Sequence, residues 1–350
     1  MIWGDIIVVF ISCFSLLLII RNVSLKLNLV DKPNYRKTHS NNTPLVGGVS
    51  IYFSILFFNF YNADSVDHSA MFMAGSALLL FVGVLDDRYD LPVLPRIVAQ
   101  AVAGVIVMID GVYLCSLGEV WFGNEVLLGS AGYFITLLAI WAAINAFNMV
   151  DGIDGLLGGL GITTFTGLLI IFSLAAMPKL VNYCLIFIAA LLPFIFLNIG
   201  FPFGSRLKIF MGDAGSTFIG FSIIWFIMIA SQGDPQRHVI APATGLWFIA
   251  VPLIDMVAVM MERILRRKNP FRPDRTHLHH LLITYGFSHF KTLVIILIFS
   301  ILGMIMGVLM EVCHVNEMFS VFVFILVFFV FLICRNILSR LSVKNKVLNF

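Results

Sequence analysis

Three oxygen-bearing side chains, Asn148, Asp151 and Asp154, recur every third residue between two long apolar runs. At this spacing they would lie on one side of a helix. Polar groups at the edge of an apolar run raise the free energy unless water, a partner or a metal ion stabilises them. Gly155 and Gly159 are explained by close packing of helices as well as by a role at a ligand site. Helix packing does not explain the three polar side chains. The trio therefore predicts a metal and ligand site.

A pair of acids, Asp86 and Asp87, closes the apolar segment 70–85 and is followed by Arg88. Adjacent carboxylates repel each other, so one tends to keep a proton unless a cation is near. The negative C-terminal end of a helix dipole disfavours them as well. These two costs favour a functional pair that binds Mg²⁺ or accepts a proton. The structural alternative is an exposed loop pair neutralised by Arg88.

A third acid, Asp213, stands between Gly212 and Gly215 where the apolar segment 215–231 begins. An acid beside glycines and hydroxyl donors at a helix N-terminus suits a metal ion and its phosphate. The stretch lacks the G-K-[ST] ending of a P-loop. An ordinary N-cap by Asp213 is the alternative interpretation.

Histidine and arginine gather in the segment 269–280, which ends in three histidines, His277, His279 and His280. Arg272 and Arg275 precede them and can hold a phosphate by paired hydrogen bonds. Zinc is less favoured, because neither an i, i+4 histidine pair on a helix nor a cysteine is at hand. An inert basic membrane anchor is the structural alternative.

A further basic segment, 36–48, contains Lys37 and His39 and ends in Gly47 and Gly48. Glycines allow the backbone to approach a ligand or another helix closely. The segment serves either as a phosphate contact or as a positively charged membrane anchor followed by a helix start.

The elements that carry these residues are membrane helices. The chain is 60% hydrophobic and 12% charged, with a mean hydropathy of +1.01, whereas soluble domains are about 25% charged. We therefore predict an all-α polytopic membrane protein, one domain over residues 1–350, with a core at about 31–290 and C-terminal spans and tail at 291–350. The first run is expected to be a retained span, not a cleaved signal. Eleven apolar segments stand out, namely 2–20, 46–61, 70–85, 97–113, 132–148, 157–176, 180–198, 215–231, 242–262, 292–310 and 318–334.

Positive charge predicts the orientation of these segments. If the connection after the first segment is cytoplasmic, 20 of the 22 Lys and Arg residues lie on the cytoplasmic side, and only Lys179 and Arg237 lie outside. This division favours eleven spans, an outer N-terminus and a cytoplasmic C-terminus. All the polar clusters then lie on the cytoplasmic face, where the active site is expected.

Acids, arginines and histidines on one membrane face suit a reaction between a polyanionic cytosolic substrate and an acceptor held in the bilayer. Phosphoryl-type transfer relies on such positioning and charge neutralisation. A transporter would instead place carboxylates near the bilayer midplane in paired repeats. A non-enzymatic carrier of lipid anions is the distant alternative, and we expect no nucleic-acid partner.

Four motifs carry a family resemblance. They are D-D-R at 86–88, N-A-F-N-M-V-D-G-I-D-G at 145–155, F-M-G-D-A-G-S at 210–216 and P-D-R-T-H-L-H-H at 273–280. In this order they resemble the polyprenyl-phosphate N-acetylhexosamine-1-phosphate transferases. The last loop is most similar to the bacterial branch that moves GlcNAc-1-phosphate from UDP-GlcNAc to undecaprenyl phosphate, with UMP released.

The resemblance implies a bacterial inner-membrane enzyme that uses Mg²⁺, for which Mn²⁺ can substitute, and that forms a homodimer. It implies the first membrane step of a cell-surface polysaccharide of the O-antigen or enterobacterial common antigen type. Another UDP-N-acetylhexosamine or UDP-MurNAc-pentapeptide as donor is the alternative. The choice between direct attack and an aspartyl intermediate stays open.

The resemblance also implies residue roles. Asp213 would be the main metal ligand, with Asn148 or Asp151, and Asp86 and Asp87 would lie near the lipid phosphate, where one activates or orients it. The remaining roles divide by the part of the substrate: Asn148, Asp151 and Asp154 for the nucleotide, Phe210 for the uracil, His277, His279, His280, Arg272 and Arg275 for the diphosphate and sugar, and Lys37 and His39 for phosphate. Among these, Asp151, Asp154 and His279 are also implied as catalytic.

Overall fold

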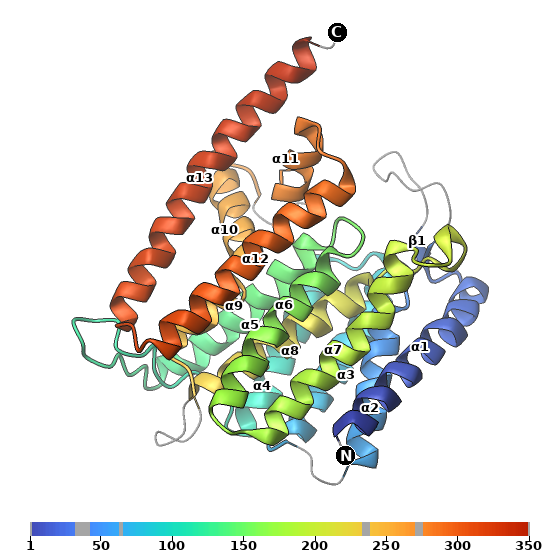
Figure 1. The fold of residues 1–350 in the computed structure, drawn as a ribbon, viewed down its shortest axis with the longest axis horizontal. Coiled ribbons are helices and arrows are strands. Elements are labelled where there is room, and N and C mark those ends of the chain that lie inside the picture. The colour runs from blue at the N-terminus through green and yellow to red at the C-terminus, as the bar shows by residue number, and fades with distance from the viewer. Residues whose placement is uncertain (1, 32–42, 63–65, 233–238, 270–275, 349–350) are drawn as a thin grey trace.

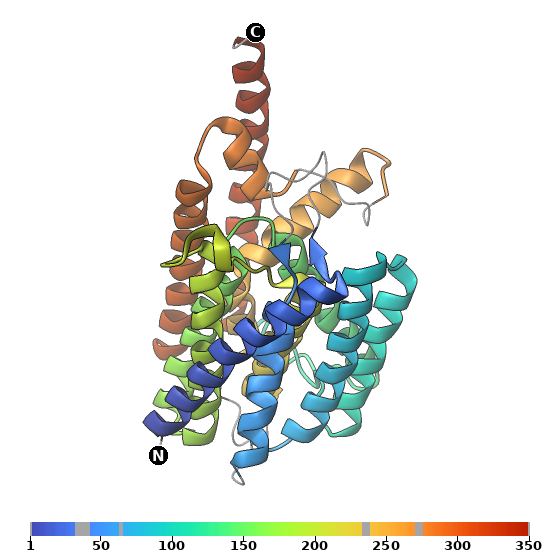
Figure 2. The same ribbon diagram turned by 90° about the vertical axis from the view of Figure 1, so that its right-hand side faces the viewer.

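The protein is a bundle of long helices with the two chain termini at opposite ends (Figures 1 and 2). This computed structural model describes the chain except for residues 1, 32–42, 63–65, 233–238, 270–275 and 349–350. Its elements are α1 (Ile2–Leu27), β1 (Val30–Asp31), β2 (Thr43–Pro44), α2 (Gly47–Tyr61), α3 (Ser69–Tyr89), α4 (Val93–Ile109), α5 (Ala131–Val150), α6 (Leu156–Leu174), α7 (Pro178–Ile199), η1 (Gly204–Leu207), α8 (Gly212–Gln232), α9 (Pro242–Phe248), α10 (Ala250–Leu265), α11 (Leu278–Tyr285), α12 (His289–Val312) and α13 (Glu317–Leu348).

The polytopic all-α prediction is confirmed. Among the described residues, eight helices are long and apolar enough to cross a membrane, or nine if the bent pair α9–α10 forms one span. Helices α2 and α4 are apolar but shorter. They coincide with the two remaining apolar segments expected from the sequence, so all eleven segments contain a helix. By length and hydropathy, eight or nine of these helices are long enough to cross a membrane.

The segment 242–262 is not the single straight helix that its apolar run predicts. It is divided into α9 and α10, which meet at 84°. Pro252 explains the break, because its ring would clash with the carbonyl of Phe248 four residues earlier and offers no N–H in return. The hydroxyl of Thr164 donates a 2.8 Å hydrogen bond to that Phe248 carbonyl, so the broken backbone stays satisfied inside the bundle.

Helix α8 forms the centre of the bundle and packs against α2, α3, α5 and α6. It is apolar on all sides, as expected of a buried helix. Its aromatic side chains stack with those of neighbouring helices. The rings of Phe72 and Trp225, for example, lie 4.5 Å apart.

Small residues bring α2 and α3 against the first turn of α8. A Cβ atom added to Gly48 would lie 2.1 Å from Cα of Gly215, and one added to Gly83 would lie 2.3 Å from Cα of Ala214. Such backbone contact is possible only where side chains are absent. Gly83 lies one turn before Asp87, so this packing also brings the acidic end of α3 to the start of α8.

The short β1–β2 ribbon connects the first loop to the same region. Val30 pairs with Pro44, and the next residue, Leu45, forms a bridge with Phe210 just before α8. Hydrogen bonds of 2.8–3.2 Å, from the Phe210 N–H to the Pro44 carbonyl and from the Val46 N–H to the Phe210 carbonyl, fix this contact.

Candidate functional site

A cavity of about 300 Å³ lies where the ends of α3, α4, α5, α10 and α11 meet. It brings together residues from three clusters that are far apart in the sequence. The predicted site residues that line it are Asp86, Asn148, Asp151, His277, His279 and His280. Its other polar or charged lining residues are Arg96, Gln100, Asn145, Thr217 and Arg263.

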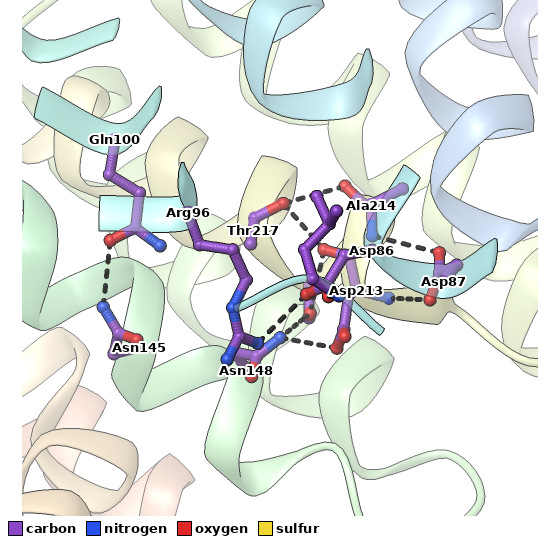
Figure 3. Close-up of polar contacts among 11 residues, drawn as sticks. Asp86, Asp87, Arg96, Gln100, Asn145, Asn148, Asp213, Ala214 and Thr217 are labelled. Atoms are coloured by element: carbon purple, nitrogen blue, oxygen red, sulfur yellow. Dashed lines mark hydrogen bonds and ion pairs between the residues drawn. The ribbon is translucent and has the colours of Figure 1, made fainter. Parts of the chain in front are cut away.

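Asp213 lies in the first turn of α8, beside this cavity, and Asn148 orients its carboxylate. The Asn148 side-chain amide donates hydrogen bonds to Asp213 Oδ1 at 2.9 Å and to the Ser216 hydroxyl at 2.8 Å (Figure 3). The amide N–H group therefore faces the acid and the helix, and Asn148 joins the end of α5 to the start of α8.

Asp87 provides the N-terminal cap of α8 from a different helix. Its carboxylate accepts hydrogen bonds from the backbone N–H of Asp213 at 2.8 Å and of Ala214 at 3.3 Å. A negative charge at this position also interacts favourably with the helix dipole. The capping role that we considered for Asp213 thus belongs to Asp87.

Asp86 is buried and held by two donors. Its carboxylate accepts the Leu91 N–H at 2.8 Å and pairs with the Arg96 guanidinium at 3.0 Å. The exposed loop pair neutralised by Arg88 is therefore not what the chain forms. Arg88 turns away and donates to the Asn28 carbonyl at 2.7 Å.

The helical stripe expected for Asn148, Asp151 and Asp154 is wrong. Helix α5 ends at Val150, Asp151 follows it, and Gly155 adopts φ +79° before α6 begins. That backbone conformation suits glycine and ends regular helix geometry. The three side chains consequently separate, and Asp154 does not line the cavity.

Asp154 instead belongs to a second polar group, outside the cavity lining. Its carboxylate pairs with Lys208 Nζ at 2.6 Å, and the same ammonium lies 5.4 Å from the centre of the Phe210 ring. Phe210, predicted to flank a nucleobase, thus shares the Lys208 side chain with Asp154. Lys208 is a residue that the sequence interpretation did not assign.

Loss of solvation, and then repulsion among the acids, are the main electrostatic features of the site. The Asp213 carboxylate acts unfavourably on Asp86, Asp87 and Asp151. Asp151 is exposed to the cavity. Desolvation, and then repulsion from Asp213 and Asp154, raises its pKa to about 7. In the described residues no hydrogen bond engages its carboxylate, which leaves it available to a cation or a proton.

A buried acid in α10, Asp255, orients the histidine segment. Its carboxylate contacts His277 Nδ1 at 2.9 Å and accepts the Leu278 N–H at 3.0 Å. A carboxylate on Nδ1 selects the tautomer that carries its proton there, and Nε2 is then left as an acceptor. Sequence interpretation missed Asp255. The only signal was a single acid within an apolar run, which in membrane proteins is rarely without purpose.

His279 is the most enclosed histidine of the cavity lining. Its imidazole packs against Gly152, where an added Cβ would lie 2.1 Å from Nε2, and among the described residues this nitrogen has no hydrogen-bond partner. Burial, and then the neighbouring histidines 280, 277 and 289, lowers its pKa to about 2. His279 is therefore neutral at physiological pH and offers a hydrogen bond, not a charge.

Four predicted phosphate contacts, Lys37, His39, Arg272 and Arg275, lie outside the described residues. Within the described part of the chain, Arg96 and Arg263 supply positive charge to the cavity wall. Neither was assigned from the sequence, since each resembles an ordinary positive-inside residue at a helix end.

The donor set fits a magnesium ion that shares its ligands with a substrate. Across the described residues, no three His, Cys, Asp or Glu side chains converge to hold a metal by themselves. Mg²⁺ commonly binds through one or two carboxylates, with phosphate oxygens and water completing the shell. Asp213, Asp151 and the adjacent Asn148 provide such a set, and the repulsion among the acids favours a cation between them.

Comparison with known proteins relates this site to a chemistry. Residues 69–231 match the profile of glycosyl transferase family 4. This range contains Asp86, Asp87, the loop after α5 and Asp213. It ends before the histidine segment.

Full-length relatives extend the similarity over the remaining part of the chain. The undecaprenyl-phosphate alpha-N-acetylglucosaminyl 1-phosphate transferase of Escherichia coli strain K12 is 45% identical over 94% of this chain and 90% of its own length. The proteins of the same name from Yersinia pestis and Haemophilus influenzae are 43% and 39% identical, over 94% and 93% of this chain and 90% and 92% of their own lengths.

Proposed function

The chain belongs to glycosyl transferase family 4, and from this membership we propose that it transfers GlcNAc-1-phosphate from UDP-GlcNAc to undecaprenyl phosphate, with release of UMP. The observation that carries the proposal is the meeting of acidic, basic and histidine side chains from separate segments in one cavity. The relatives named for this reaction match the chain over nearly its whole length.

The reaction requires an oxygen of the lipid phosphate to attack the β-phosphorus of UDP-GlcNAc. Both substrates are anions, so the site must neutralise charge and hold them in line. Arg96 and Arg263 supply fixed positive charge on the cavity wall. His277, oriented by Asp255, offers a hydrogen-bonding nitrogen to the diphosphate or sugar.

We propose that Asp213, with Asn148 or Asp151, holds Mg²⁺, for which Mn²⁺ can substitute. The bound ion would neutralise charge on the diphosphate and stabilise the leaving UMP. Asn148 contributes mainly by fixing the Asp213 carboxylate. Asp87 fixes the position of Asp213 through its backbone N–H, so its contribution is to place the metal ligand.

Asp151 is the acid best suited to act on the lipid phosphate directly. Its carboxylate faces the cavity, and its pKa of about 7 suits proton transfer near neutral pH. Asp154 is less suited, because Lys208 occupies its carboxylate. A role for Asp154 and Phe210 beside the nucleobase agrees with their common contact to Lys208.

The finer cellular setting is also a proposal. The protein is a multi-pass membrane protein, and the charge distribution supports an N-terminus outside and a C-terminus in the cytoplasm. The bacterial inner membrane follows from the family resemblance. The termini at opposite ends of the bundle agree with an odd number of crossings (Figure 1). A homodimer, and a role in O-antigen or enterobacterial common antigen synthesis, rest on the family resemblance.

The test is release of UMP from UDP-GlcNAc by purified protein in detergent with undecaprenyl phosphate and Mg²⁺. We expect UMP only when both lipid and divalent cation are present. UDP-GalNAc and UDP-MurNAc-pentapeptide complete the donor panel and are expected to react poorly. Absence of UMP with every donor would reject the enzyme. Movement of lipid phosphate across vesicles without UMP would favour the carrier instead.

A further inference from the structure

The C-terminal helix α13 packs against α9, α10 and α11 on one side, and among its described side chains the two buried polar residues are Ser320 and Arg335. Only 6% of its most apolar stretch is buried within the protein. Figure 2 shows α13 extending past the other helices at the end where α11 lies. Arg335, which follows this apolar stretch, is nevertheless only 5% exposed. A buried guanidinium on a mostly exposed helix needs an explanation, because burying a charge is unfavourable unless it is paired.

Arg335 joins three parts of the protein through its two terminal nitrogens. Nη1 pairs with Glu262 of α10 at 2.6 Å, and Nη2 donates to the Thr276 carbonyl at 2.9 Å. Glu262 is itself held by Arg266 at 2.6 Å, one helical turn further along α10. The planar fork of arginine can serve a carboxylate and a carbonyl together, whereas the single ammonium of lysine has a different geometry.

The carbonyl that Arg335 holds immediately precedes the histidine segment of the cavity. Thr276 is followed by His277, and the Asp255 carboxylate holds the His277 ring and the Leu278 N–H. The start of α11 is therefore fixed twice from α10, directly through Asp255 and indirectly through Glu262 and Arg335. Displacement of the Thr276 carbonyl would move the backbone on which His277 and His279 stand.

We propose that Arg335 is a positioning residue for the transfer reaction, and that α13 holds the histidine segment in its productive place through this side chain. The inference rests on the proposed function, because it assigns a role within that reaction. It extends the functional part of the chain beyond the core at about 31–290 to a helix that otherwise faces the bilayer. Arg335 does not line the cavity, so we infer that it acts on the reaction through the Thr276 carbonyl and the histidine that follows it.

The test compares Arg335→Ala with Arg340→Ala in the full-length protein. Arg340 is exposed on the same helix and serves as the matched control. We expect Arg335→Ala to lower kcat/KM for UDP-GlcNAc by about 10–100-fold, the range known for residues that orient a metal-binding histidine. The KM for undecaprenyl phosphate should change less than about threefold. Arg340→Ala should equal the wild type.

A double-mutant cycle separates positioning from a general loss of structure. If Arg335 acts by orienting His277, the loss caused by Arg335→Ala should shrink to less than about threefold in an Asp255→Asn background, where that histidine is already misplaced. Equal losses in both backgrounds would overturn the proposal. So would wild-type kinetics in Arg335→Ala. If neither the wild type nor Arg340→Ala releases UMP, the proposed reaction itself is rejected.

Arg335→Lys keeps the inference testable if the alanine variant fails to fold. It retains the charge beside Glu262 but changes the geometry at the Thr276 carbonyl. We expect an unchanged melting temperature and a kcat/KM between those of the wild type and Arg335→Ala. If Arg335→Ala does not fold, the expected kcat/KM of Arg335→Lys is at least about threefold below that of the wild type. A lysine variant with full activity would contradict the positioning role.

Discussion

Asp213 is the residue whose surroundings are most specialised. Its backbone N–H is bound by Asp87, its carboxylate is oriented by Asn148, and its charge acts on three other acids. We expect Asp213→Asn to reduce UMP release by at least about 100-fold, since one charged metal ligand is removed while the hydrogen-bonding shape is kept. The protein should still insert and keep its melting temperature within a few degrees.

The control for this substitution is Asp110→Asn, at the other end of α4, where the acid pairs with His68 at 3.1 Å. That variant should retain activity. Titration of Mg²⁺ against turnover gives the second measurement. Near-normal activity or an unchanged Mg²⁺ requirement in Asp213→Asn would remove Asp213 from the metal role.

Asp151 allows a prediction about pH. Its pKa of about 7 in the folded protein lies above the ordinary value of 3.8, so the folded state holds the proton more tightly than the unfolded state. Stability from this group is therefore lost as pH rises from about 4 to 7. In EDTA and without substrate, Asp151→Asn should raise the melting temperature by roughly 2 °C at pH 8.

The same variant at pH 5 provides the control, because there the folded protein already carries the proton and the gain should be smaller. Turnover should nevertheless fall in Asp151→Asn at every pH. An equal stabilisation at both pH values would show that charge repulsion is not the cause.

Single residues divide into those that a sequence can indicate and those that it cannot. Asp86, Asn148, Asp151 and the histidines are evident, because polar groups at the ends of apolar runs are costly. Asp255 is different, since an acid within a span does not reveal which histidine it meets.

At the level of elements, close contact between α3 and α8 determines where the acids stand. A Cβ atom at Gly83 would lie 2.3 Å from the Cα atom of Ala214, so one of the two helix backbones would have to move. Gly83→Ala should therefore destabilise the protein by about 1–3 kcal/mol and lower activity by displacing Asp87 from the N-terminus of α8.

Gly4→Ala in α1 is the matched control, because nothing lies within 4 Å of the added Cβ. It should be neutral or slightly stabilising, as expected for alanine in a helix. Thermal unfolding in detergent measures both variants. Equal melting temperatures for Gly83→Ala and the wild type would mean that the two helices can separate without loss.

Helices were more predictable than their interruptions. Apolar runs indicated where each helix lies, because a span needs about 20 apolar residues. The end of α5 at Val150 was not indicated, although Gly152 and Gly155 follow it. The break at Ile249 was signalled by Pro252, yet proline is tolerated within membrane helices and so does not predict a break by itself.

At the scale of the whole molecule, the site is formed by the ends of helices that cross the bundle independently. No two of Asp86, Asn148, Asp213 and His277 lie on the same helix, and His277 directly precedes α11. Their meeting at one end is what the charge distribution predicted, since the basic residues and the acids share one side. The long C-terminal helix was the part least predictable from sequence, because Arg335 resembles any arginine that follows a span.

Orientation gives the last prediction. If the positive-inside distribution is correct, the cavity faces the cytoplasm, where UDP-sugars are made. Green fluorescent protein fused after the C-terminal residue should fluoresce, and alkaline phosphatase fused within the loop 114–130 should be active. The reverse fusions, phosphatase at the C-terminus and fluorescent protein in that loop, should be silent and serve as controls. The opposite pattern would place the site outside, where UDP-GlcNAc could not reach Asp213, and would contradict the proposed reaction as well as the orientation.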